Sequence, residues 1–250
     1  YSRYANKQWF HLSNVAPLMP FQISLSLFDK IKCFILGYKI KRYSYNYDYV
    51  STESCFSSKF FSEFSNCKAQ IFTSVNGGDD EIELFKSKSA DQKYLSQVAC
   101  VGTHKYKRID KVYKIFKELS IHEPELNLLI IGDFKGISRK MRSDTSVKSL
   151  GIIDRHEVVT HLSNSKYYIT TSEVENSYNA ASEGIFLAQY SYISSIEPHK
   201  ELVQSLPYVL HSFKTLNEDM LFIKKDTLTA YNLMTWDQVI QKMLLNAELK

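Results

Sequence analysis

Apolar residues in the later part of this chain form short runs that alternate with segments of helical periodicity. Five apolar runs have the length and composition of buried strands: 98–101, 126–131, 167–171, 192–194 and 208–210. Four helical segments lie between or just after them: 109–119, 156–162, 179–187 and 199–204. Continuous apolar strands that alternate with helices predict a parallel sheet with both faces covered. We therefore expect an α/β fold with a Rossmann-like lobe over residues 95–215.

The first 94 residues are rich in tyrosine, phenylalanine and serine and show a looser pattern. Apolar residues recur at spacings of three to five over residues 21–43, which predicts a long helix. Residues 47–52 and 69–73 predict two short strands, with a short helix at 57–64 between them. The polar stretch 86–96 predicts a linker. Residues 1–94 are thus expected to form a first, partial lobe.

The last segment, residues 216–250, is expected to form helices that pack on or between the lobes. Its clearest signal is Thr235-Trp236-Asp237-Gln238, which has the form of a capping box that opens a final helix.

Composition narrows the functional class only modestly. The chain has 250 residues, of which 44% are hydrophobic and 23% charged, and these proportions exclude a disordered protein. No apolar run approaches the roughly 18 residues that a membrane span needs. The net charge of +4 is too small to indicate nucleic acid as a partner. The four cysteines form no C-x-x-C pair, so we expect buried free thiols in a cytoplasmic protein.

Ligands of open α/β sheets bind beyond the carboxyl ends of the strands, so the residues that follow each predicted strand are the first candidates. After the first of these strands, Gly102-Thr103-His104-Lys105-Tyr106-Lys107-Arg108 combines a glycine turn with clustered cations. Such a loop can neutralise a diphosphate. The alternative is a solvated lysine face that continues through Lys111, Lys114 and Lys117.

A second group of candidates follows the strand at 167–171. Glu175 lies in the loop, and Glu183 lies about one turn inside the helix predicted at 179–187. Two carboxylates there could accept hydrogen bonds from hydroxyls of a sugar or ribose, while the helix N-terminus between them offers N–H groups to phosphate oxygens. The alternative is that Glu175 is a surface charge and Glu183 a solvated or capping residue. The seven histidines form no recognisable catalytic or zinc motif.

Taken in order along the chain, these features resemble family 4 of the retaining glycosyltransferases with the two-domain GT-B fold, the group 1 transferases. The motifs that carry the resemblance are Val101-Gly102 to Lys107, Leu128 to Gly132, Ser149 to Ile153, Thr171-Ser172 with Glu175 to Glu183, Ser195 to Glu201, Thr235-Trp236-Asp237, and, in the first segment, Tyr47 to Ser54 and Val75 to Asp79. The fold that this resemblance implies is α/β and GT-B-like, with two Rossmann-like lobes. The first lobe here would lack its opening strands.

The resemblance also implies roles for individual residues. Lys107 would bind the donor diphosphate and offset charge on the leaving group. Glu175 would contact hydroxyls of the donor sugar, and the backbone N–H groups of Asn176, Ser177 and Tyr178 would lie against the sugar and phosphates. Glu183 would hold the ribose hydroxyls. The surrounding donor-binding residues would be Gly102, Thr103, Lys105, Gly132, Asp133, Ile153 and His156.

Two departures from the family pattern bear on the site. The arginine that usually follows the Val-Gly pair is Thr103 here, so Lys105 would substitute for it with poorer geometry for a bidentate phosphate contact. The family's glycine-containing loop is Glu175-Asn176-Ser177-Tyr178 here, which makes close backbone approach to a sugar harder.

The resemblance therefore implies a glycosyltransferase. It would move a hexose from a nucleotide diphosphate sugar to a hydroxyl acceptor, such as a sugar or a lipid-linked saccharide, with retention and without a metal or other cofactor. Bacterial surface polysaccharide or glycolipid synthesis at the inner face of the membrane is the implied setting, with the lysines of 105–117 as a weak membrane contact. Two alternatives stay open: a non-catalytic subunit that binds nucleotide sugars, and a nucleotide-sugar epimerase of the same fold.

Overall fold

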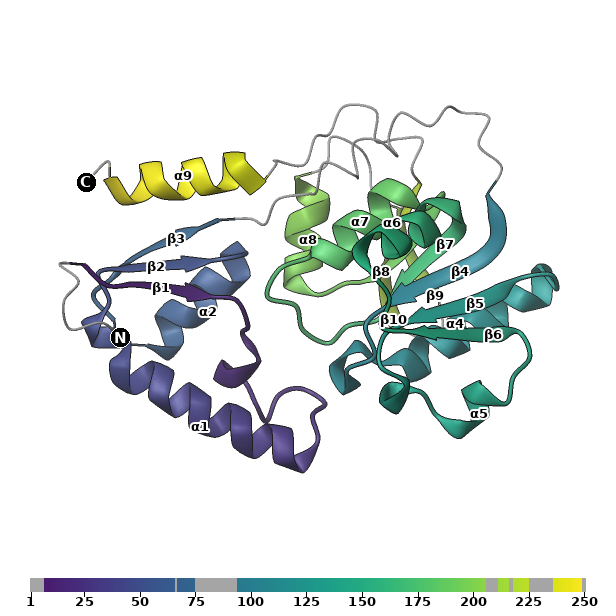
Figure 1. Ribbon diagram of the computed structural model, residues 1–250, viewed down its shortest axis with the longest axis horizontal. Coiled ribbons are helices and arrows are strands. Elements are labelled where there is room, and N and C mark those ends of the chain that lie inside the picture. The colour runs from purple at the N-terminus through teal and green to yellow at the C-terminus, as the bar shows by residue number, and fades with distance from the viewer. Residues whose placement is uncertain are drawn as a thin grey trace. The chain divides into compact units, whose positions relative to one another are not determined.

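The computed structural model describes residues 7–65, 67–74, 94–205, 211–215, 218–224 and 236–248 (Figure 1). The chain divides into two compact units. Unit 1 comprises Tyr1–Gly78, Val174–Tyr178 and Leu233–Lys250, and unit 2 comprises Asp79–Glu173 and Asn179–Asn232.

Among its described residues, unit 1 contains a three-stranded parallel sheet in the order β1 (Trp9–Leu12), β2 (Tyr49–Thr52), β3 (Gln70–Thr73). Every residue of β2 is buried because this strand is the central one. Helices α1 (Leu27–Tyr43) and α2 (Cys55–Phe64) lie on one side of the sheet, and α9 (Trp236–Glu248) lies on the other (Figure 1). The side-chain amide of Gln70 donates to the carbonyl of Asn246, which ties α9 to β3.

Serine caps fix where the first two helices begin. The hydroxyl of Ser26 accepts a hydrogen bond from the backbone N–H of Asp29 at the start of α1. Ser54 does the same for Ser57 at the start of α2. These are standard N-cap arrangements, and each satisfies a backbone donor that the helix itself leaves unpaired. Two short 3-10 turns, η1 (Ala16–Leu18) and η2 (Ser44–Asn46), precede and follow α1.

The described residues of unit 2 include a seven-stranded sheet in the order β6-β5-β4-β7-β8-β10-β9. Five of the strands pair in parallel, and they are β6 (Val147–Gly151), β5 (Asn127–Ile131), β4 (Leu95–Val101), β7 (Ser165–Thr170) and β8 (Tyr190–Ser194). The remaining two, β10 (Glu218–Lys224) and β9 (His211–Thr215), add antiparallel pairs beyond β8.

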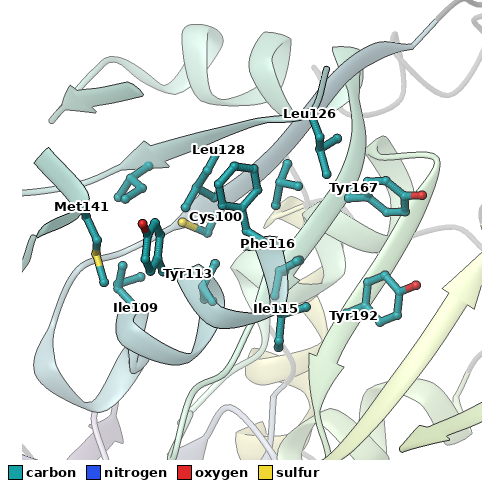
Figure 2. Packing of buried hydrophobic residues seen from close by; sticks show 14 of the residues in the cluster. Cys100, Ile109, Tyr113, Ile115, Phe116, Leu126, Leu128, Met141, Tyr167 and Tyr192 are labelled. Atoms are coloured by element: carbon teal, nitrogen blue, oxygen red, sulfur yellow. The ribbon is translucent and has the colours of Figure 1, made fainter. Parts of the chain in front are cut away.

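Helices cover both faces of this sheet. Helix α4 (Ile109–His122) packs on one face, where Phe116 and Val112 meet Cys100 and Leu128 in a cluster of buried apolar side chains (Figure 2). Helix α7 (Asn179–Leu187) packs on the other face, so close to Tyr168 that a Cβ atom at Gly184 would lie 2.1 Å from its ring. The connections also contain α6 (Arg155–Asn164), α8 (Glu197–Gln204), α5 (Arg139–Arg142), η3 (Lys105–Lys107) and η4 (Phe134–Gly136).

Four of the five strands and all four helices expected over 95–215 are confirmed, and the structure differs from the sequence expectations in three other respects. Residues 218–224, expected within a helical segment, form strand β10, because pairing with β8 and β9 decides their conformation. The sheet consequently ends in antiparallel strands rather than being parallel throughout. Strands β1 and β6 were not expected, since neither is a continuous apolar run.

Several expectations fall outside the described residues: the strand at 208–210, most of the linker at 86–96, the motif at 75–79, and the Thr235 of the final capping box. Among the cysteines, Cys100 is buried, and burial raises the pKa of its thiol to about 12. Cys55 is exposed, so the expectation that all four thiols are buried was wrong.

Candidate functional site

The strand order of unit 2 places a topological switch point between β4 and β7. From β4 the chain proceeds outward through β5 to β6 on one side, and it then returns to form β7 and β8 on the other side. In open α/β sheets ligands bind in the crevice at the carboxyl ends of the strands, at the place where this reversal occurs. The loops that follow β4 and β7 are therefore the ones to examine. They contain the two groups of residues that the sequence singles out.

The loop after β4 folds back over the end of its own strand. Gly102 has a φ of +88°, a left-handed conformation that favours glycine. The Lys107 side chain lies over this glycine, because a Cβ atom at position 102 would be 3.2 Å from the lysine Cε. The turn η3 brings the chain back, with the backbone N–H of Lys107 donating to the carbonyl of His104. Lys107 is thus held beside the end of β4, as the sequence predicts.

Three interactions tie this loop to the loop after β7. The Thr171 hydroxyl lies within hydrogen-bond distance of the carbonyl oxygens of Lys107 and Arg108, at 3.1 and 2.8 Å. The backbone N–H of Glu173 donates to the carbonyl of Tyr106 over 2.8 Å. The side chains of Arg108 and Glu173 form an ion pair of 2.7 Å. The two loops at the switch point therefore form one connected structure.

Arg108 is the centre of this connection, and the sequence reasoning gave it no individual role. It adopts a left-handed conformation with a φ of +49°, which costs a non-glycine residue roughly 1 kcal/mol. Its guanidinium contacts both Asp110 and Glu173. Hydrogen bonds with Asp110, and then with Glu173, raise the pKa of Arg108, and the bond with Arg108 lowers the pKa of Asp110. The only signal in the sequence was its place among the cations that follow β4.

The loop after β5 meets the loop after β4 at very close range. The Thr103 hydroxyl donates to the carbonyl of Asp133 over 2.8 Å. A Cβ atom at Gly132 would be 2.9 Å from the threonine methyl group, and one at Gly136 would be only 2.1 Å from the Thr103 carbonyl oxygen. Asp133 also caps η4 by accepting from the backbone N–H of Lys135. Four predicted residues, Gly102, Thr103, Gly132 and Asp133, are thus brought together at the ends of β4 and β5.

A further part of the predicted site lies where α6 meets α7. Glu183 is in the middle of α7, and its side chain is only 12% exposed. One carboxylate oxygen lies 2.7 Å from the guanidinium of Arg155, the first residue of α6. Asp154 caps this helix, and the predicted residues Ile153 and His156 flank that cap. The structure therefore joins Glu183 to the 153–156 stretch through Arg155, a residue that the sequence reasoning did not single out.

Of the remaining five predicted residues, Lys105 is the first residue of η3 in unit 2, and the other four belong to unit 1, because Val174–Tyr178 is part of that unit. Asn176 is buried, and its side-chain amide donates to the carbonyl of Leu12 and to the Glu53 carboxylate. Its carbonyl and side-chain oxygens each lie 3.0 Å from the hydroxyl of Ser57. Tyr178 is buried as well, while Glu175 and Ser177 are partly exposed. The place of these residues relative to Lys107 and Glu183 stays a prediction.

Unit 1 contains a polar cluster at the carboxyl ends of β1 and β2 that the sequence reasoning missed. The two ring nitrogens of His11 lie 2.8 Å from the Ser51 hydroxyl and 3.3 Å from the Glu53 carboxylate. Glu53 is almost fully buried, whereas the His11 side chain is 39% exposed. An exposed imidazole held by a buried carboxylate can accept or donate a proton. Glu53 directly follows the predicted strand 47–52, which was the one available signal.

Comparison with solved structures identifies similar folds. Sucrose-phosphate synthase from Thermosynechococcus elongatus matches with a TM-score of 0.57 and 14% identity over 78% of the chain. Trehalose 6-phosphate synthase from Burkholderia multivorans matches with a TM-score of 0.54 and 10% identity over 78%. HepE from Anabaena, determined in complex with UDP and glucose, matches with a TM-score of 0.53 and 14% identity over 98%.

The chain spans between 51% and 62% of the length of these three proteins. No protein-family model matches the sequence, and no curated protein is similar to it. At such low identity the matches show the fold and no more. The α/β, GT-B-like fold that the sequence predicts is thereby confirmed.

Proposed function

We propose that this chain is a glycosyltransferase that moves a hexose from a nucleotide diphosphate sugar to a hydroxyl acceptor, with retention at the anomeric carbon. The observation that carries the proposal is the loop Gly102–Arg108 at the switch point, with Lys107 lying over Gly102 and the whole loop tied to Thr171 and Glu173. The GT-B-like fold supports it, since one protein of similar fold was determined with UDP and glucose bound.

In this proposal Lys107 and the backbone of its loop receive the diphosphate. The bond between the anomeric carbon and the diphosphate oxygen breaks, a new bond to the acceptor oxygen forms, and the acceptor proton leaves with the diphosphate. Negative charge builds on the leaving diphosphate as this happens, and a fixed ammonium group beside it lowers the barrier. Lys105 adds a second cation on the same turn. Because the Lys107 side chain is held over Gly102, little reorganisation is needed before its ammonium group stabilises the leaving diphosphate.

The nucleoside would lie toward α6 and α7. Glu183, already oriented by Arg155, would accept hydrogen bonds from the ribose hydroxyls. Gly132, Asp133, Ile153 and His156 would border the base. Glu175 and the backbone of residues 176–178 would contact the sugar. The exposed His11 ring, supported by Glu53, would contact the acceptor hydroxyl. Surface polysaccharide or glycolipid synthesis is the setting in which we place this activity.

Calorimetric titration of the chain with UDP, GDP, ADP and CMP tests donor binding directly. We expect one diphosphate to bind selectively and Lys107→Ala to weaken that binding by about tenfold, the order of a lost charge-assisted hydrogen bond. Lys114→Ala is the matched control, because Lys114 is an exposed lysine of the helix that follows. Failure of all four nucleotides to bind a folded sample would contradict the proposed function, as would equal losses in the two variants.

Transfer itself needs a second measurement. Incubation of the matching nucleotide sugar with a panel of hydroxyl acceptors should release the nucleotide diphosphate, and NMR of the product should show the anomeric configuration of the donor. Tight binding without release would favour the non-catalytic subunit. Conversion of the free donor without an acceptor would favour the epimerase.

A further inference from the structure

Helix α1 has one side that packs against the rest of unit 1 and an opposite side that is also apolar. The packed side is fixed by Gly37, where an added Cβ atom would lie 2.1 Å from the Pro17 carbonyl oxygen. Ile40, three residues further on, is buried on the same side. With 3.6 residues per turn, these two positions define the side of the helix that faces the protein.

The opposite side consists of large apolar residues that remain in solvent. Leu27, Ile31, Phe34 and Tyr38 follow one another at intervals of three or four residues, so they form one stripe along the helix. Phe28 and Ile35 lie next to these residues and widen the stripe. The exposed fractions of all six members lie between 51% and 76%, and the members are Leu27, Phe28, Ile31, Phe34, Ile35 and Tyr38. Phe21, 68% exposed, extends it, with its ring 6.0 Å from that of Phe34. Apolar surface of this extent marks an interaction site.

Lysines border the apolar stripe along both sides. On a helical projection Lys30 and Lys41 fall on one side of it, and Lys32 and Lys39 fall on the other. Arg42 adds a fifth cation near the end of the helix, and Asp29 is its one acidic residue. The alkyl parts of lysine side chains can cover apolar surface while their ammonium groups reach outward. The result is a wide apolar face framed by positive charge.

We propose that α1 docks on an anionic lipid surface, lying in the plane of the interface. Charge complementarity favours this occupant over a protein partner, because the helix has five cations and one acidic residue, and four of the cations border the apolar face. Each basic residue near an anionic membrane contributes attraction. Phenylalanine, tyrosine and leucine suit the boundary between headgroups and acyl chains. No helix among the described residues is long and apolar enough to cross a bilayer.

This inference is independent of the proposed donor site. It also moves the membrane contact from the lysines of 105–117, where the sequence reasoning put it, to α1. Helix α4 carries lysines, but its large apolar side chains are mostly buried on the sheet. Cations without an accompanying apolar face give only weak, salt-sensitive attraction.

Co-sedimentation with vesicles tests the inference, using phosphatidylcholine vesicles with and without phosphatidylglycerol. The full chain should bind the anionic vesicles and leave the neutral ones largely unbound. The triple variant Phe28→Ser, Ile31→Ser, Ile35→Ser should bind at least about tenfold more weakly, because these side chains no longer enter the interface. Lys32→Gln with Lys39→Gln should weaken binding by about fivefold for each charge removed.

Helix α9 supplies the matched control. Ile240, Leu244 and Leu245 are also about half exposed, but their helix contains one lysine, Lys242, and two acidic residues, Asp237 and Glu248. Substituting these three by serine should leave vesicle binding unchanged.

Equal losses in the two triple variants would overturn the inference, as would absence of binding to anionic vesicles. A concentration-dependent dimer that only the α1 variant abolishes would overturn it too, since a second copy would then cover this face. A far-UV circular dichroism spectrum and a urea unfolding curve that match those of the parent chain show that the α1 variant is folded.

Discussion

The guanidinium of Arg155 lies 2.7 Å from a carboxylate oxygen of Glu183, and this ion pair joins the first turn of α6 to the middle of α7. Arg155 is 39% exposed at the side chain, whereas Glu183 is only 12% exposed. The ion pair fixes the orientation of the carboxylate, so the carboxylate can accept further hydrogen bonds in a defined direction. The ribose contact that we propose for Glu183 would use this orientation.

Glu183→Gln should weaken nucleotide binding by about 1–2 kcal/mol, the order of a lost hydrogen bond to a charged group. Calorimetry with the best-binding nucleotide measures this loss. Arg155→Gln separates a direct contact from an effect on helix packing, because it breaks the ion pair but keeps the carboxylate. We expect that variant to weaken binding by about threefold, less than Glu183→Gln, because the carboxylate loses its fixed orientation but can still accept hydrogen bonds. Unchanged affinity in Glu183→Gln would remove this residue from the site.

Gly136→Ala should destabilise unit 2 by about 1–3 kcal/mol, the usual cost of forcing an extra carbon into a packed contact. The added Cβ atom would be 2.1 Å from the Thr103 carbonyl oxygen, and a backbone atom cannot move aside as the end of a flexible side chain can. Urea denaturation measures the effect. Lys135→Ala, at the exposed neighbouring position, is expected to stay within about 0.5 kcal/mol. A Gly136→Ala variant as stable as this control would show that the loops after β4 and β5 can separate without cost.

Asp144 should make the stability of unit 2 depend on pH in the acid range. Hydrogen bonds from Ser146 and Tyr113 hold the pKa of this carboxyl well below its ordinary value of 3.8. A lowered pKa in the folded state means that the ionised form stabilises the fold. That contribution is fully present above the ordinary value. It is lost as the pH falls below about 4 toward the lower pKa of the folded state.

Asp144→Asn tests this assignment through urea unfolding at pH 7, 5, 4 and 3. The variant should be less stable at pH 7 by about 1–2 kcal/mol, since a charged acceptor of several hydrogen bonds is replaced by a neutral one. Its stability should also fall less between pH 5 and pH 3 than that of the parent chain. Asp237→Asn, at an exposed position, gives the baseline. Parallel pH curves for the parent chain and Asp144→Asn would contradict the assignment.

The elements that the sequence predicts correctly are those whose pattern is decided locally. The helix at 179–187 has the predicted bounds, and the apolar runs near 98–101 and 126–131 became β4 and β5. Strand β10 has the sequence EDMLFIK, which suits a helix as well as a strand, and only its partners β8 and β9 decide the outcome. Strand β1 is four residues long with polar His11 among them, so no local signal separates it from a loop.

The candidate site shows the same limit. The position of Lys107 at the end of β4 could be predicted because it follows a buried strand and a glycine, whereas its role in binding stays a prediction. Arg155 could not, because its role depends on contact with Glu183, which lies 28 residues further along the chain. The burial of Asn176 in unit 1 could not be predicted either, because its hydrogen-bond partners Leu12 and Glu53 lie 164 and 123 residues away along the chain. Side chains whose function comes from long-range contacts leave no local pattern.

His11→Ala should lower the rate of sugar transfer without changing nucleotide affinity. The imidazole lies at the end of β1, 2.8 Å from Ser51 and 3.3 Å from Glu53, where it could receive the acceptor hydroxyl. Loss of a positioned acid or base typically costs a hundredfold or more, so we expect kcat to fall by at least about that factor. His122→Ala, at an exposed position near the end of α4, should leave kcat unchanged. If His11→Ala keeps full turnover, the His11–Ser51–Glu53 cluster only holds β1 and β2 in register, and the acceptor must bind elsewhere.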